Sequence, residues 1–107
     1  TYFTESKLAM GVPPEVVEQH GVISRETAEA MAAAARARLG ADIGLGITGI
    51  AGGDEVEGQP PGTMHIAVTD GARTAYARTT FYQGRLAAKQ RAVTDALNLL
   101  RTFLAEE

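Results

Sequence analysis

The chain has 107 residues, 45% of them hydrophobic, and a formal net charge of −3 at pH 7. This length fits one domain with a small core, and the acidic balance provides no basic surface for nucleic acid. The absence of cysteine excludes disulfides and cysteine-bound metal and is typical of a cytoplasmic protein. No apolar run approaches the roughly 18 residues of a membrane span, so we expect no membrane partner.

The first residues indicate the end of a strand that runs directly into a helix. Residues 2–4 are Tyr-Phe-Thr, and residues 5–10 are helix-like until Gly11 stops them. Because no cap precedes this helix, we interpret residues 2–4 as the tail of a strand whose beginning is missing. The alternative is a trimmed terminus with nothing structural upstream. A second short helix is expected over residues 15–20.

The helix over residues 25–39 is the best-defined element of the sequence. Ser24 is a suitable N-cap, and Gly40 is a suitable residue to end the helix. Apolar residues at helical spacing predict one packing face, formed by Ala28, Met31, Ala32, Ala35 and Leu39. Because this face is mostly alanine, we expect the helix to pack closely against a sheet.

Three strands are predicted after this helix. Residues 41–48 carry few charges, which is typical of a strand covered on both faces. Residues 63–69 and 73–82 alternate with period 2 and are joined by Asp70-Gly71, which predicts an antiparallel hairpin. Residues 53–62 between them form a Gly- and Pro-rich loop. The acidic residues of this loop are expected to face water: Asp54, Glu55 and Glu57.

The last element is a helix over residues 85–104. Its large apolar residues share one face that is predicted to contact the core, with Ala96 and Phe103 beside it: Leu86, Val93, Leu97, Leu100 and Leu104. The order of elements predicts an α/β fold, a three-layer α/β/α sandwich with a mixed sheet, as a single domain over residues 1–107. The sheet is thin for two long helices, so an N-terminal strand and helix are expected to be missing. The exposed sheet edge or apolar patch should then promote self-association.

Residues 44–49 match the dinucleotide-binding pattern G-x-G-x-x-G literally. That fingerprint needs its glycines at a turn from strand into helix, whereas here two glycines lie inside the strand and a loop follows. A Rossmann-type dehydrogenase is therefore disfavoured. The stretch from Thr48 to Gly52 could instead place a hydroxyl and backbone N–H groups at a strand end, beside a substrate. A threonine that caps an ordinary turn is the alternative.

Charged side chains leave several interpretations open. Lys7 is either a solvated surface charge or a partly buried general base. Arg85 and Lys89 are helical neighbours of like charge that either hold a phosphate or face solvent. His20 and His65 are the only histidines. Neither has a nearby acidic residue at a sequence spacing that would indicate a catalytic pair, so no Ser-His-Asp arrangement is predicted.

Several stretches together resemble the CinA C-terminal domain family, in the family's order and spacing. They are Tyr2-Phe-Thr-Glu-Ser-Lys7-Leu-Ala-Met-Gly-Val12, His20-Gly-Val-Ile-Ser24, Leu39-Gly-Ala-Asp42, Ile47-Thr-Gly-Ile-Ala-Gly52 and Pro61-Gly-Thr63. Members of this family include nicotinamide-nucleotide amidases, which hydrolyse nicotinamide mononucleotide to nicotinic acid mononucleotide and ammonia. The resemblance, and not the periodicity, implies this activity, with no cofactor and no metal.

The resemblance also implies roles for particular residues. Lys7 matches the lysine that activates a serine nucleophile, Tyr2 matches the tyrosine of a Y-S/T-N motif, and Thr48 matches a threonine that helps to build the site. These three are the expected catalytic residues. The expected substrate-binding residues are Thr4, Gly49, Ile50, Ala51, Gly52 and Arg85, with Arg85 on the 5′-phosphate.

The chain departs from the family pattern at several positions. The E-S-C-T-G-G stretch that carries the family's serine is not part of this sequence. Thr4 stands where the family usually has Asn, and Phe3 where it has Ser or Thr. The family's G-D-R step reads Gln83-Gly84-Arg85, so the Asp is lost, and Lys89 replaces a common Arg.

We therefore predict deamidation of nicotinamide mononucleotide in pyridine nucleotide recycling, by Ser–Lys acyl transfer with the serine outside this chain. The alternative is a catalytically inactive nucleotide-binding or assembly module of a CinA-like protein. The expected partners are a small-molecule nucleotide and a second copy of the chain in a dimer, in the cytoplasm.

Overall fold

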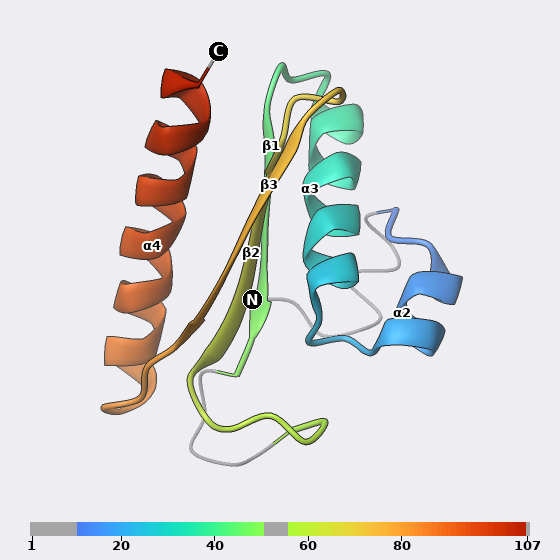
Figure 1. Cartoon of the computed structure of the whole chain (residues 1–107). Helices are drawn as coiled ribbons and strands as arrows, with labels where there is room; N and C mark the ends of the chain where they lie inside the picture. Colours follow the sequence, from blue (N-terminus) through green and yellow to red (C-terminus); the bar gives the residue numbers. More distant parts are fainter. Residues whose placement is uncertain (1–10, 51–55, 107) are drawn as a thin grey trace.

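The fold has three layers, with a sheet between two long helices (Figure 1). The structure is a computed structural model and describes residues 11–50 and 56–106. Its elements in chain order are α2 (Pro14–His20), α3 (Arg25–Leu39), β1 (Gly44–Gly49), β2 (Thr63–Thr69), β3 (Thr74–Thr80) and α4 (Arg85–Ala105). Helix α3 covers one face of the sheet, α4 covers the other, and α2 lies against α3. The predicted α/β/α sandwich is confirmed.

The sheet has the order β1-β2-β3, and both pairings are antiparallel. Strand β2 is central and buried along its whole length, including the polar residues Thr63, His65 and Thr69 on one of its faces. Within the described residues the sheet is purely antiparallel. The strand that would make it mixed was predicted at residues 2–4, which lie outside them. Strand β1 is an edge of this sheet and leaves Leu45 39% exposed, so the expectation that it is covered on both faces is wrong.

Helix α3 has the predicted bounds because both of its ends are specified locally. The Ser24 hydroxyl accepts the Thr27 N–H at 3.1 Å, and Gly40 ends the helix at φ 62°. Ala28 and Ala32 are fully buried against β1 and β2. Leu39, predicted on the same face, is 77% exposed at the last turn of the helix.

Helix α4 buries a different face from the one predicted. The leucine face is largely exposed, including Leu86, Val93, Leu97 and Leu104. The residues buried against β2 and β3 are Ala88, Ala92, Ala96 and Phe103. These residues also recur at helical spacing, and the small side chains of the three alanines let the helix approach the sheet closely. The hydrophobic pattern identified the helix correctly but selected the wrong side of it.

The exposed leucine face of α4 should make the chain self-associate. Replacing Val93 by Glu and Leu97 by Lys places an i,i+4 ion pair on this face and should lower the apparent mass measured by light scattering. The free energy of unfolding should change by no more than about 0.5 kcal/mol, because both side chains are exposed.

The control for this double variant is Gln90→Glu with Thr94→Lys, which adds the same charges at exposed polar positions of the same helix. It should leave the association unchanged. A wild-type chain that remains monomeric at high concentration would contradict this expectation.

Candidate functional site

Strand β1 ends at the same end of the sheet at which the two long helices, α3 and α4, begin (Figure 1). Beyond Gly49 the chain forms a loop whose base is closed by two backbone bonds: Ile50 donates to the Thr63 carbonyl and Gly62 donates to the Ile50 carbonyl, both at 2.9 Å. Phe81, just after β3, donates to the Gly62 carbonyl at 3.2 Å. The end of β1, the base of the loop and the approach to α4 are therefore joined at one end of the sheet.

Thr48 lies at this end with its side chain turned inward. It is 3% exposed, and its hydroxyl donates to the Val22 carbonyl at 2.8 Å. One lone pair of the oxygen can still accept a hydrogen bond. At Gly49 a Cβ would overlap the sulfur of Met64 and the carbonyl oxygen of Thr63, so only glycine fits there. Thr48 is thus an interior hydroxyl fixed by the segment before α3.

The other predicted site residues are only partly described. Tyr2, Thr4, Lys7, Ala51 and Gly52 lie outside the described residues. The remaining predicted residues are Ile50, which is buried, and Arg85, which is exposed. The Ile50 N–H is bonded within the loop base, so it is not available to a substrate in this structure.

Arg85 is the first residue of α4, where the backbone N–H groups of the helix point outward. The N-cap residue Gly84 makes no side-chain cap, and no acid lies in the first turn. A helix start with an added cation favours an anionic group. Lys89 is exposed one turn further along, so this end of α4 is positively charged.

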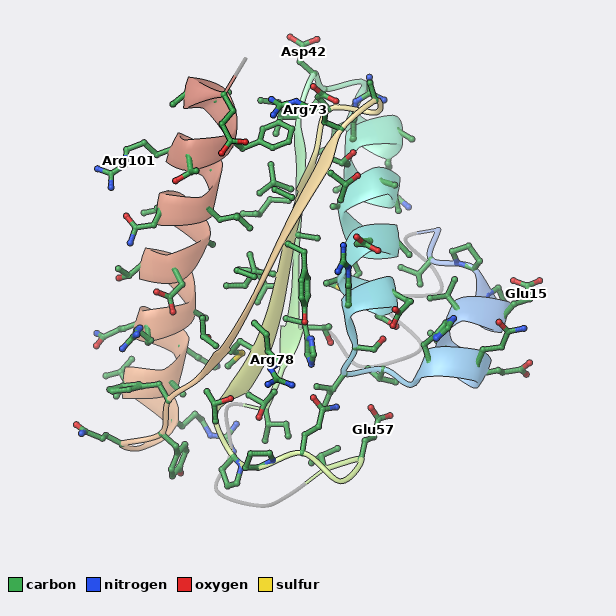
Figure 2. All side chains as sticks on the ribbon, in the orientation of Figure 1. Glu15, Asp42, Glu57, Arg73, Arg78 and Arg101 are labelled. Atoms are coloured by element: carbon green, nitrogen blue, oxygen red, sulfur yellow. The ribbon has the colours of Figure 1, made fainter. Side chains whose placement is uncertain are left out.

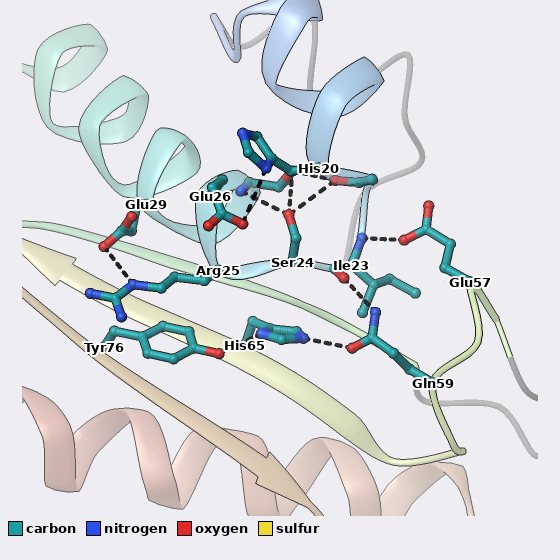
Figure 3. A network of polar contacts seen from close by, with 12 residues as sticks. His20, Ile23, Ser24, Arg25, Glu26, Glu29, Glu57, Gln59, His65 and Tyr76 are labelled. Atoms are coloured by element: carbon teal, nitrogen blue, oxygen red, sulfur yellow. Dashed lines mark hydrogen bonds and ion pairs between the residues drawn. The ribbon is translucent and has the colours of Figure 1, made fainter.

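The loop between β1 and β2 is fastened to the segment before α3 by Glu57 and Gln59 (Figure 3). The Glu57 carboxylate accepts the N–H of Val22 at 3.0 Å and of Ile23 at 2.8 Å. The Gln59 amide donates to the Ile23 carbonyl at 2.6 Å. Glu57 is exposed, as expected, but its carboxylate also binds these two backbone N–H groups, and Asp54 and Glu55 lie outside the described residues. Sequence reasoning missed this contact because its partners are backbone groups 34 to 36 residues away.

His65 on β2 continues this network. Its Nε2 lies 2.7 Å from Gln59 Oε1, and its Nδ1 lies 2.7 Å from the Tyr76 hydroxyl. Burial and the nearby Arg78 guanidinium lower the pKa of His65, whereas burial raises the pKa of Tyr76. Arg78 lies at the same end of the molecule as the loop (Figure 2). The histidine is thus held neutral within a hydrogen-bonded chain.

His20 has an acidic neighbour that the sequence did not reveal. Its Nδ1 lies 3.7 Å from a carboxylate oxygen of Glu26. Both side chains are substantially exposed, and such surface pairs contribute little to stability. The contact joins α2 to the first turn of α3.

Neither a metal centre nor a membrane span is found in the parts of the chain that the structure describes. No three His, Asp or Glu residues among positions 11–50 and 56–106 are grouped so as to hold a metal ion. No helix within those positions is long and apolar enough to cross a bilayer.

A family model described as the CinA C-terminal domain matches residues 1–104. The chain belongs to the CinA C-terminal domain family. A CinA-like protein of Solibacter usitatus is 41% identical over 103 residues, which are 94% of this chain and 25% of that protein. The family predicted from the sequence motifs is therefore confirmed.

Solved structures of the family share the fold described above. The competence damage-inducible protein A (ComA) of Klebsiella pneumoniae superposes with a TM-score of 0.91 at 30% identity, covering 98% of this chain and 66% of that one. The competence/damage inducible protein CihA of Agrobacterium tumefaciens gives a TM-score of 0.87 at 31% identity, with 95% and 64% covered. The chain thus spans about a quarter of the curated relative and about two thirds of these two structures.

Proposed function

We propose that this domain contributes part of the active site of an amidase that converts nicotinamide mononucleotide to nicotinic acid mononucleotide and ammonia. The observation that carries the proposal is that the Thr48 strand end and the cationic start of α4 lie at the same end of the sheet, where the bond from Phe81 to Gly62 links the approach to α4 with the base of the loop. The substrate carries a neutral carboxamide and an anionic 5′-phosphate. A hydroxyl with neighbouring N–H groups suits the first, and Arg85 suits the second.

The proposed reaction is acyl transfer without histidine. A serine hydroxyl from the family's E-S-C-T-G-G stretch attacks the carboxamide carbon while Lys7 takes its proton. Lys7 returns the proton to the departing nitrogen, the C–N bond breaks, and ammonia leaves an acyl-serine ester. Water then attacks the ester, releases nicotinic acid mononucleotide and restores the serine. His65 takes no part, because both of its ring nitrogens are engaged.

We assign supporting roles in this chemistry to the other site residues that the family pattern indicates. The Thr48 hydroxyl, already donating to Val22, accepts a hydrogen bond from the substrate or from Lys7. Stabilisation of the developing oxyanion is assigned to the N–H groups of Gly49, Ala51 and Gly52. In the same scheme Tyr2 and Thr4 complete the substrate site. The activity belongs to cytoplasmic pyridine nucleotide recycling, and the enzyme acts as a dimer.

The test is ammonia release from nicotinamide mononucleotide by the complete natural protein and its Lys7→Ala variant. Removing a general base should lower kcat by a factor on the order of 10² to 10⁴. Arg101→Ala is the control, because Arg101 points away from the sheet near the far end of α4 (Figure 2), and it should retain full activity. An unimpaired Lys7→Ala variant would reject the mechanism, and an inactive wild-type protein would reject the function.

A nucleotide-binding or assembly module without catalysis is the second candidate. The donation from the Thr48 hydroxyl to Val22 favours it, because a purely structural threonine would make the same bond. Calorimetric binding of nicotinamide mononucleotide by a complete protein that releases no ammonia would identify this candidate.

A further inference from the structure

The Val22-Ile23 dipeptide between α2 and α3 is held entirely by side chains from a distant part of the chain. Glu57 accepts both of its N–H groups, at 3.0 and 2.8 Å. Gln59 donates to the Ile23 carbonyl at 2.6 Å, and Thr48 donates to the Val22 carbonyl at 2.8 Å. The loop and the proposed site residue Thr48 therefore bind the same dipeptide (Figure 3 shows the loop side of this contact).

Glu57 makes this contact from a strained backbone conformation. Its φ of 53° is the only positive value at a non-glycine residue among the described positions. Gly58 follows with φ 75°, and the bridge between Val56 and Gln59 closes the turn. Such turns favour Asn, Asp or Gly at the place that Glu57 occupies. Its two hydrogen bonds to backbone N–H groups explain why a glutamate is held there.

The segment before α3 is shaped to receive the carboxylate. A Cβ at Gly21 would lie 2.8 Å from Glu57 Oε1, and its φ of 86° also favours glycine. The Gly21 carbonyl accepts the hydroxyl of Thr27 at 2.6 Å and that of Ser24 at 3.1 Å. The receiving segment is therefore tied to the first turn of α3, which gives the loop a rigid attachment.

The orientation of the Gln59 amide is fixed at both ends. Its nitrogen must face the Ile23 carbonyl, so its oxygen faces His65 Nε2, which carries the hydrogen. Neutral His65 then accepts the Tyr76 hydroxyl at Nδ1. The guanidinium carbon of Arg25 lies 4.6 Å from the centre of the Tyr76 ring and covers the end of this chain of bonds.

We propose that Glu57 and Gln59 are positioning residues that fix the base of the loop between β1 and β2, and with it Thr48 and Ile50 at the end of β1, for substrate binding. The inference rests on the proposed amidase function. The bonds of Ile50 hold the base of the loop, and Glu57 and Gln59 hold its turn. Loss of these hydrogen bonds loosens the loop and weakens substrate binding, while Lys7 and the serine, which lies outside this chain, keep their chemistry.

The test compares Glu57→Gln and Glu57→Gly in the complete natural protein. Both variants lose the paired acceptor, but only glycine relieves the backbone strain, so their melting temperatures should differ. Both should nevertheless raise KM for nicotinamide mononucleotide by about tenfold, with kcat changed by less than about threefold. A role in stability alone would make KM follow the melting temperature instead.

Glu15→Gln is the matched control, because Glu15 is an exposed acid on α2 (Figure 2) and the charge change is the same. It should leave KM and kcat within about twofold of wild type. Amide hydrogen exchange at Ile50 and Gly62 should quicken in both Glu57 variants and stay unchanged in α4.

An unchanged KM in an active protein would overturn the positioning role and leave the proposed function standing. A wild-type protein that releases no ammonia would overturn the function and the positioning role together. In that case amide hydrogen exchange alone decides whether Glu57 holds the loop in place. Unchanged exchange at Ile50 and Gly62 in the Glu57 variants would reject this structural role as well.

Discussion

Replacing Gly46 by alanine should prevent the domain from folding stably. A Cβ at this position would overlap the carbonyl oxygen of Ala28 and lie 2.8 Å from the backbone nitrogen of Ala32. Both atoms belong to the backbone of α3, so no side-chain rotation can make room. Overpacking of a tight core commonly costs about 1 to 3 kcal/mol, and two backbone overlaps place this variant at or beyond the upper end. Urea unfolding followed by circular dichroism measures the loss.

The matched control for this variant is Gly40→Ala. Gly40 has φ 62° at the end of α3, and nothing lies within 4 Å of a Cβ built there. Alanine at this position should lower the free energy of unfolding by only about 1 kcal/mol, which is the cost of holding a non-glycine residue in the left-handed conformation. Alanine at Gly46 loses stability only through the overlap of its Cβ with the backbone of α3, because the φ of Gly46 is not in the left-handed region. Equal losses in the two variants would show that α3 does not pack on β1 as closely as described.

The same glycines explain a misleading feature of the sequence. Gly44 and Gly46 supply the first two glycines of the G-x-G-x-x-G match, yet in the structure they lie inside β1 beneath α3. Their spacing of two places both on the face toward the helix, since side-chain positions alternate along a strand. The glycines therefore serve close packing between strand and helix, and the informative part of the stretch begins at Thr48.

Elements that are specified by neighbouring residues could be predicted from the sequence. Ser24 and Gly40 mark the ends of α3 within the helix's own sequence, and the alternation over residues 63–69 gives β2 its observed bounds. Contacts between distant segments could not be predicted. The bond from Thr48 to Val22 spans 26 residues, and the bonds of Glu57 depend on a backbone conformation that its residue type does not favour.

The buried face of α4 is another feature that could not be predicted from the sequence of the helix alone. Two sets of apolar residues share the helical period, and hydrophobicity alone favours leucine over alanine as the core contact. The choice depends on how close the helix can come to β2, where Met64 packs with Ala88 and Ala92. That closeness is a property of the sheet surface, which the helix sequence does not encode.

Replacing Phe103 by alanine should therefore cost far more than replacing any exposed leucine of α4. Phe103 is 2% exposed, and its ring lies beneath the guanidinium of Arg73, whose carbon is 4.1 Å from the ring centre. Arg73 also donates to the Phe103 carbonyl at 3.0 Å. Removing a buried phenylalanine costs about 3 to 5 kcal/mol, whereas Leu97→Ala, at a side chain 59% exposed, should cost less than about 1 kcal/mol.

Urea unfolding at low protein concentration measures both variants while self-association is suppressed. The contrast is decisive because the sequence pattern places Leu97 on the predicted core face and Phe103 only beside it. A Leu97→Ala loss as large as that of Phe103→Ala would mean that α4 turns its leucine face to the sheet. The alanine contacts with β2 would then be wrong, and with them the description of this layer of the sandwich.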